Sequence, residues 1–292
     1  MLVSQADNIL LGNQEVQRVY LGKKLVWERT VYGLPPYGTS WNLYGVPPCE
    51  YYYLKPGIHL KGFSSTGEFM FTCAESPEKM DFTRIKSIHV KYSGIYGRTG
   101  VIGGIGTILS TRQNQPQSMI SLVFSKRLFP ESNSAVMDCR QIGGEFFLLL
   151  YSDLDYTLDI TGLAFEYYPP KNVFDISSET WEQRNFQYQT QTVLTCNTEI
   201  KVPANALEIA VHLSANNGKA LKNCVAFLNE NKELISYGEG WQGTVLDSAP
   251  VSTHVQEIPE NTAYVQISAG YAPDMTEIIQ PSELKSCVLC FS

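Results

Sequence analysis

The sequence predicts an all-β protein in which an N-terminal hairpin and arm precede two β-sandwich domains of jelly-roll type. Short segments with alternating apolar and polar residues recur along the chain, as in 88–92 and 163–168, and turns rich in Gly, Pro and Asn separate them. No segment keeps the 3.6-residue period of an amphipathic helix beyond two turns. The 17 Tyr and 13 Phe residues favour strands, because aromatic side chains fit the half-buried surface of a sheet.

The length of 292 residues corresponds to two domains of about 100–150 residues each. A hydrophobic content of 43% is enough for packed cores. Pro169 and Pro170 end the first block of strands and mark the domain boundary. We therefore expect an N-terminal attachment hairpin in 1–30, a Pro/aromatic arm or linker in 31–57, a first β-sandwich in 58–170 and a second, jelly-roll-like β-sandwich in 171–292.

Residues 16–28 have the pattern of a small β-hairpin. Gly22 and Lys23 occupy the position of a tight turn between two runs of β-branched or bulky residues. A two-stranded hairpin is marginally stable alone, so we expect it to dock onto the following domain or onto another chain. The alternative is that it is the ordinary first strand pair of a β domain. The residues expected to make the attachment contact are Val16, Val19, Tyr20, Leu21, Leu25, Val26 and Trp27.

The same region resembles the N-terminal clip of tail and fibre proteins from tailed bacteriophages. The resemblance rests on Ile-Leu-Leu-Gly at 9–12, followed by Val-Tyr-Leu-Gly-Lys-Lys-Leu-Val-Trp at 19–27. In those proteins this end attaches the chain to the virion. The resemblance implies the same role for the hairpin.

Residues 34–48 are dense in Pro, Gly and aromatic residues, and paired prolines disfavour both a helix and a central strand. We expect a stiff, extended arm that either packs across a neighbouring subunit or wraps its own domain. Charged residues make up only 17% of the chain, so exposed aromatics would leave an apolar patch in water. The sequence therefore predicts a homo-oligomer, a trimer if the protein is a fibre.

The second block carries another resemblance. Residues 224–236 read as strand, turn and strand, 258–262 form a turn that precedes a strand at 263–268, and 284–291 offer a closing strand. Residues 227–236 and 258–267 are similar to a jelly-roll module of phage tail proteins and of surface proteins from gut bacteria. The chain has Asn229 where that module usually has Asp and Gln266 where it usually has Arg. The resemblance thus implies a fold and no charge-based ligand role.

The overall charge and the cysteines exclude several classes of function. The net charge is −7 and no basic patch stands out, so nucleic acid is not expected as a partner. No apolar run approaches the ~20 residues of a membrane span, and no signal peptide is recognisable, so synthesis in a cytoplasm is expected. The seven cysteines are scattered and are expected to be buried thiols.

Catalytic and metal motifs are also missing from the sequence. The glycine-rich segment 97–106 lacks the Lys-Ser/Thr of a phosphate loop, and no G-x-S-x-G motif occurs. Asp153, Asp155 and Asp159 could hold Ca²⁺, but a solvated turn is the favoured interpretation. The four histidines are far apart, and His89 and His212 are expected to face solvent. We expect no metal, no cofactor and no enzymatic activity.

A glycan platform is the alternative hypothesis for one tryptophan. Trp241 lies in the glycine-rich segment 238–243, which is expected to form a loop, and Glu239 and Gln242 could bind sugar hydroxyls beside its ring. Burial in the core or in an interface is the competing interpretation for Trp241 and for Trp181.

Together the patterns and resemblances predict a non-enzymatic structural protein of a bacteriophage virion. It would be a tail, collar or fibre component, made in the bacterial host cytoplasm and anchored by its N-terminus to other virion proteins. The alternative is a carbohydrate-binding β-sandwich module that recognises a host surface glycan. A glycan-degrading enzyme is least favoured, because sequence alone cannot place two carboxylates across a cleft.

Overall fold

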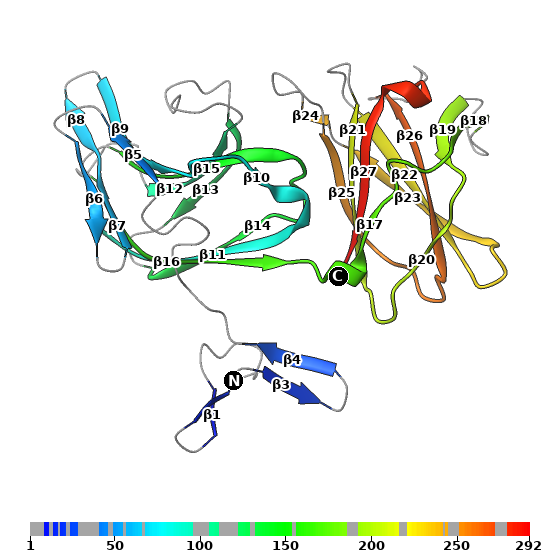
Figure 1. Cartoon of the computed structure of the whole chain (residues 1–292), viewed down its shortest axis with the longest axis horizontal. Coiled ribbons are helices and arrows are strands. Elements are labelled where there is room, and N and C mark those ends of the chain that lie inside the picture. The colour runs from blue at the N-terminus through cyan, green and yellow to red at the C-terminus, as the bar shows by residue number, and fades with distance from the viewer. Residues whose placement is uncertain are drawn as a thin grey trace.

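The computed structural model describes the residues 9–11, 14–16, 18–21, 24–28, 41–45, 49–54, 57–65, 68–95, 105–110, 122–128, 132–153, 156–185, 192–215, 221–241, 243–244, 251–271 and 279–292. In these ranges the chain forms strands, three short 3-10 helices and no α-helix, which confirms the predicted all-β class. Figure 1 shows two β-sandwiches side by side, with the N-terminal strands drawn apart from both.

The first sandwich consists of two antiparallel sheets. One has seven strands, in which β10 pairs with β15, β8 pairs with β9, and the others follow the order β13-β12-β15-β9-β5. The second sheet has five strands in the order β14-β11-β16-β7-β6. The strands are β5 (Asn42–Gly45), β6 (Glu50–Leu54), β7 (Gly57–Lys61), β8 (Phe63–Ser65), β9 (Glu68–Glu75), β10 (Met80–Asp81), β11 (Ile85–Ile95), β12 (Ile105–Ser110), β13 (Leu122–Leu128), β14 (Ser134–Asp138), β15 (Glu145–Asp153) and β16 (Thr157–Tyr167), and the 3-10 helix η2 is Phe82–Arg84.

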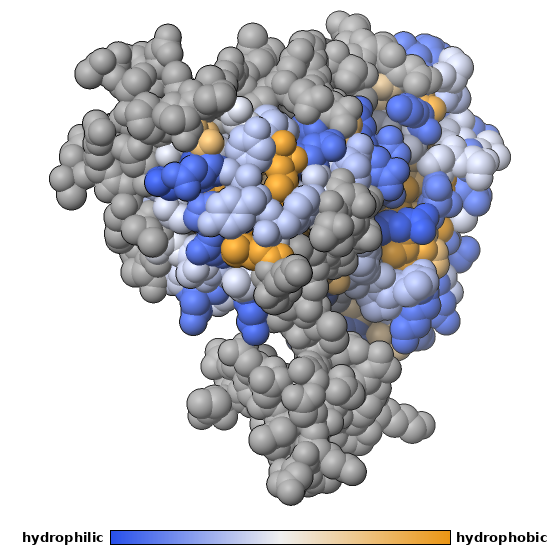
Figure 2. All heavy atoms as spheres, turned by 60° about the vertical axis from the view of Figure 1, so that its left-hand side comes forward, coloured by the Kyte–Doolittle hydropathy of each residue, from blue (hydrophilic) through white to orange (hydrophobic). Residues whose placement is uncertain are grey.

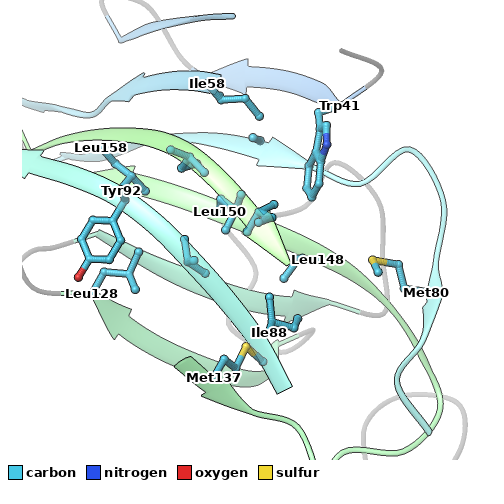
Figure 3. Close-up of a cluster of buried hydrophobic side chains, with 14 of the residues drawn as sticks. Trp41, Ile58, Met80, Ile88, Tyr92, Leu128, Met137, Leu148, Leu150 and Leu158 are labelled. Atoms are coloured by element: carbon cyan, nitrogen blue, oxygen red, sulfur yellow. The ribbon is translucent and has the colours of Figure 1, made fainter. Parts of the chain in front are cut away.

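Alternate residues of these strands meet in one core between the two sheets (Figure 3). Ile58 and Leu60 of β7 and Leu148 and Leu150 of β15 have no exposed surface. Because the side-chain period of a strand is two, the residues between them point to the outer faces. Burial of each such side chain stabilises the fold by about 1.5–3 kcal/mol.

The expected arm in 31–57 is corrected by the structure where its residues are described. Segments 42–45 and 50–54 are strands β5 and β6 of the first sandwich, and Trp41 is 4% exposed in its core. The hydroxyl of Tyr53 donates a 2.6 Å hydrogen bond to the carbonyl of Trp41. In the sequence, Pro47, Pro48 and Pro56 fall outside β5 and β6. Both strands lie at the edges of their sheets, where prolines next to a strand are compatible with pairing. This part of the chain therefore belongs to its own domain; 31–40 and 46–48 lie outside the described residues.

The second sandwich also has two antiparallel sheets. The five-stranded sheet has the order β17-β27-β21-β25-β24, and the six-stranded sheet has the order β18-β19-β26-β22-β23, with β20 paired to β26. The strands are β17 (Val173–Asp175), β18 (Trp181–Asn185), β19 (Thr192–Cys196), β20 (Ile200–Lys201), β21 (Glu208–Ala215), β22 (Leu221–Leu228), β23 (Leu234–Trp241), β24 (Gly243–Thr244), β25 (Val251–Glu257), β26 (Tyr264–Tyr271) and β27 (Leu284–Phe291), and the 3-10 helices are η4 (Pro170–Asn172) and η5 (Pro281–Glu283).

The predicted strand-turn-strand element at 224–236 is present as β22 and β23. The side-chain Oδ1 of Asn229 accepts hydrogen bonds of 2.9 Å from the backbone N–H groups of Asn231 and Glu233. Lys232 has a φ of 63° in this turn, and Asn261 has a φ of 65° in the predicted turn before β26. The closing strand is also confirmed, since β27 covers Leu284–Phe291.

The N-terminal strands form two separate hairpins. β3 (Arg18–Leu21) pairs with β4 (Lys24–Glu28), and Leu21 faces Lys24 across the predicted turn position. β1 (Ile9–Leu11) pairs with β2 (Gln14–Val16), so Val16 belongs to a first hairpin that the sequence did not predict. Among the described strands, neither hairpin pairs with a sheet of the sandwiches.

The two sandwiches have separate cores but share a junction. One core cluster spans Trp41 to Leu163 and the other spans Ile176 to Phe291. At the junction, the ring of Tyr168 belongs to a buried cluster with Ala210, Val288 and Cys290. The independent folding of 171–292 stays a prediction, because this junction buries part of its outer surface.

Candidate functional site

The outer face of the five-stranded sheet β14-β11-β16-β7-β6 gathers polar and aromatic side chains. His59 and Lys61 alternate with the core residues Ile58 and Leu60 of β7, so their side chains point outward. The register places Tyr52 of β6 and Asp159 of β16 directly opposite His59, on either side of it. Glu50 is the partner of Lys61 in the same register. We call Glu50, Tyr52, His59, Lys61 and Asp159 the Tyr52 face.

A glycine lets this hairpin lie against β16. Gly57 has a φ of +132°, which side chains of L residues rarely adopt. A Cβ at this position would lie 2.2 Å from the carbonyl oxygen of Ile160. The glycine is therefore required for the close approach that brings β6 and β7 beside β16.

The centre of the Tyr52 face is a stacked pair of rings. The rings of Tyr52 and His59 are parallel within 15°, and their centroids are 4.4 Å apart. Nδ1 of His59 lies 2.5 Å from Oδ1 of Asp159, so the imidazole donates a hydrogen bond to the carboxylate. Tyr52 is 50% exposed, whereas the His59 side chain is only 12% exposed. One face of the Tyr52 ring therefore packs on the His59 imidazole, and the ring remains exposed to solvent on its other side.

A charge pair lies beside the rings. Nζ of Lys61 donates a 2.7 Å hydrogen bond to Oε1 of Glu50. This hydrogen bond and the lysine charge lower the pKa of Glu50 below its usual value. Both charged groups of this pair are thus compensated at neutral pH.

A second polar cluster on the same sheet contains a serine, a histidine and a glutamate. The hydroxyl of Ser87 donates a 2.6 Å hydrogen bond to Oε2 of Glu166, and it lies 3.0 Å from Nε2 of His89. Nζ of Lys86 lies 3.2 Å from the other carboxylate oxygen of Glu166. Contact with the His89 imidazole, together with Ser87 and Lys86, lowers the pKa of Glu166 to about 2.

This cluster has the residue types of a nucleophilic triad but not its geometry. Because Ser87 has only one hydroxyl proton and gives it to Glu166, His89 must donate to the serine oxygen. A general base would have to accept that proton, and the acid of a triad would contact Nδ1 of the histidine. The hydrogen bonds instead join β11 to β16, so the cluster stabilises the sheet.

Metal sites and membrane spans are not found in the part of the chain that the structure describes. No group of three or more His, Cys, Asp or Glu side chains there could hold a metal ion. Of the aspartates considered for Ca²⁺, Asp159 binds His59, while Asp155 and the side chain of Asp153 lie outside the described residues. No described helix is long and apolar enough to cross a membrane.

The expected exposure of the two strand histidines is corrected. His212 is 3% exposed, and burial lowers its pKa to about 4. Its strand β21 lies in the middle of a sheet whose outer face contacts the first sandwich, so the polar side of the pattern is covered. His89 is half-buried, with a side chain 23% exposed.

The proposed glycan platform is in part a strand rather than a loop. Residues 238–241 belong to β23, where Glu239 pairs with Cys224 and Trp241 pairs with Lys222. A Cβ on Gly238 would lie 1.6 Å from the side-chain oxygen of Gln256, so the Gln256 side chain would have to move to admit one. The side chains of Glu239 and Trp241, and all of Gln242, lie outside the described residues. Trp181 is buried and donates a 3.2 Å hydrogen bond to the carbonyl of Ile176.

The attachment residues are placed only by their backbone. Val16 lies on β2, Val19, Tyr20 and Leu21 lie on β3, and Leu25, Val26 and Trp27 lie on β4. Their side chains lie outside the described residues, so the contact they make stays a prediction.

Sequence reasoning missed the Tyr52 face. His59 and Asp159 are 100 residues apart in the chain, and the sequence pattern around β6 predicts an arm rather than a strand. The available signal was the run Tyr51-Tyr52-Tyr53, which places one ring on the opposite face of a strand from its neighbours.

The space-filling view in Figure 2 shows the surface that the first sandwich presents on one side. The hydrophobic residues coloured there form small, separate patches among hydrophilic ones.

Comparison with known proteins defines no family for the chain. No protein-family description matches it, and no curated protein matches its sequence. The match to the tandem CBM22 domains of Xyn10C from Paenibacillus barcinonensis covers 90% of this chain and 98% of those domains, with 9% identity and a TM-score of 0.25. The match to VP2 in the subviral particle of infectious bursal disease virus covers 89% of this chain and 74% of VP2, with 13% identity and a TM-score of 0.26. The match to a protein of Parabacteroides distasonis covers 90% of this chain and 99% of that protein, with 6% identity and a TM-score of 0.21. By its own sheets and cores, the chain is a tandem β-sandwich protein.

Proposed function

We propose that the protein is a non-enzymatic structural component of a tailed-bacteriophage virion, of the tail, collar or fibre type. The supporting observation is the pair of N-terminal hairpins, which share no strand with the described sheets of the two sandwiches. Because a two-stranded hairpin is marginally stable in water, its folded form needs a surface to pack on. A neighbouring virion protein would supply that surface.

The resemblance of residues 9–12 and 19–27 to the clip of phage tail proteins supports the same role. The β3–β4 hairpin has the turn position that this resemblance requires. In this proposal the protein resides in the virion, and the two sandwiches extend from the anchored end.

The described polar clusters support a role without catalysis. The hydroxyl of Ser87 is engaged by Glu166, and His89 donates to it rather than accepting its proton. This reversed polarity leaves no activated nucleophile at the cluster that most resembles one.

A homo-oligomer, a trimer if the protein is a fibre, remains part of the proposal. The aromatic residues of 41–54 support a homo-oligomer less than the sequence suggests, because Trp41 is buried in its own domain. Tyr51 is 40% exposed and remains a candidate for contact with another subunit.

The test is incorporation of a truncated chain into particles. A variant lacking 1–30 should remain folded and soluble but should be absent from purified virions, as measured by mass spectrometry of the particles. Arg184→Ala is the matched control, since Arg184 is an exposed residue of the second sandwich that pairs only with neighbours there. Normal incorporation of the truncated chain would show the attachment role to be wrong.

A further inference from the structure

We propose that the Tyr52 face binds a neutral carbohydrate. The first reason is the shape of its exposed surface. Tyr52 is half exposed on the outer side of an edge strand, and its ring is parallel to the imidazole beneath it. The C–H face of a sugar ring packs on such an aromatic ring, and a flat ring with polar neighbours meets this requirement.

The second reason is that the ring is held in place before any ligand binds. The imidazole of His59 is fixed by the hydrogen bond between its Nδ1 and Asp159, and both residues come from paired central strands. Tyr52 stacks on this fixed imidazole. A side chain that is already oriented loses less rotational entropy when a ligand binds, so the support improves the platform.

The third reason concerns hydrogen bonds. Glu50 uses Oε1 to bind Lys61, and Asp159 uses Oδ1 to bind His59. Each carboxylate has a second oxygen, and no other described residue donates to it. Sugar hydroxyls are donors that could reach these acceptors on either side of the tyrosine ring.

The charge of the face favours a neutral ligand. The Glu50 carboxylate pairs with the Lys61 ammonium, and the Asp159 carboxylate accepts a hydrogen bond from the His59 N–H. An anionic ligand would meet two carboxylates, and a cationic ligand would have to displace existing partners. A neutral ligand rich in hydroxyls, with one apolar face, fits what remains.

A protein partner fits this face less well. The centre of a protein interface is normally a contiguous apolar area depleted of charge. The Tyr52 face has one exposed ring surrounded by four polar or charged side chains. One exposed ring with polar side chains around it instead offers a single stacking surface beside several hydrogen-bonding groups.

The experiment uses the full-length protein in native gels that contain one soluble neutral polysaccharide each: dextran, mannan, laminarin or xylan. We expect at least one of them to retard the wild-type protein. Tyr52→Ala should weaken that binding at least tenfold, whereas Tyr52→Phe should keep it because the ring remains. Tyr167→Ala is the matched control, since Tyr167 is 56% exposed and lies outside this face.

A second variant keeps the proposal testable if Tyr52→Ala disturbs the fold. Glu50→Ala leaves both rings in place and removes only one acceptor, so it should weaken binding to the same polysaccharide. The proposal is overturned if none of the four polysaccharides retards the wild-type protein, or if Tyr52→Ala and Glu50→Ala bind as the wild type does. The result is independent of the proposed virion role, because binding is measured on purified protein and incorporation on particles.

Discussion

Arg140 of the first sandwich and Glu208 of the second form an ion pair across their junction, with Nη1 of Arg140 2.5 Å from Oε2 of Glu208. The same guanidinium donates a 2.8 Å hydrogen bond from Nη2 to Asp138. The hydroxyl of Ser292 lies 3.2 Å from the same oxygen of Glu208. One arginine therefore connects the end of β14 to the beginning of β21 and to the C-terminal residue.

Removing this guanidinium should loosen the junction. In Arg140→Ala, Asp138 and Glu208 lose their shared cation, and we expect about 1 kcal/mol less stability, since the pair is only partly buried. Limited proteolysis should then cut faster near the exposed residues 169–171. Arg184→Ala, which removes an exposed pair with Glu182, is the control. Equal cleavage rates in both variants would contradict the connecting role of Arg140.

Separating the sandwiches should expose a buried thiol. Cys290 has no exposed surface, belongs to the junction cluster with Tyr168, and donates a 3.4 Å hydrogen bond to the carbonyl of Thr83. Burial raises its pKa to about 12. A fragment of residues 171–292 lacks Tyr168 and Thr83, so we expect Cys290 to react rapidly with Ellman's reagent in the fragment and slowly in the full chain.

The fragment experiment also tests the domain boundary. Cys290→Ala in the same fragment assigns the labelled thiol, because Cys287 on the same strand points into the inner core. If the fragment is folded and Cys290 stays protected, the junction does not provide the protection. If the fragment is only aggregated, the boundary at Pro169-Pro170 is wrong.

The second sandwich was the easier one to predict, because its signals are local. Asn229 closes its own turn with its side chain, and the alternation in 284–291 identifies both faces of the strand without knowledge of a partner. The first sandwich depends more on remote pairing. Trp41 and β5 are ordered by β9, whose pairing residues begin 27 positions later at Thr72 opposite Gly45. A pattern of prolines and aromatics cannot reveal such a partner.

The candidate site shows the same limitation. Tyr52 and His59 are neighbours in one hairpin, but Asp159 joins them only through the pairing of β7 with β16. The buried state of His212 likewise depends on packing by another domain. Alternation identifies the face of a strand, and tertiary contacts decide whether that face meets water.

Replacing the Glu166 carboxylate should make the stability of the protein less dependent on pH in acid. The pKa of Glu166 is lowered to about 2, so it stabilises the fold above its unfolded pKa near 4.5 and this contribution is lost as pH falls toward 2. Because its side chain is 46% exposed, solvent screening limits the effect to about 1 kcal/mol. Glu166→Gln should therefore be less stable at pH 7 and equal to the wild type near pH 2 by urea unfolding. An unchanged difference at both pH values would contradict this assignment.

His212 should make the protein sensitive to mild acid in a different range. Its pKa is lowered to about 4 by burial, which the charge of Asp81 only partly offsets. The unfolded chain binds a proton near pH 6.5 and the folded chain does not until about pH 4, so stability falls across this window and then levels off. The total loss of stability is on the order of 3 kcal/mol. We expect His212→Gln to remove this slope, as measured by the free energy of unfolding at pH 7, 5.5 and 4.5.

Ser214→Ala, on the same face of β21, changes no titrating group and should keep the slope of the wild type. Parallel curves for the wild type and His212→Gln would mean that His212 is not the group responsible.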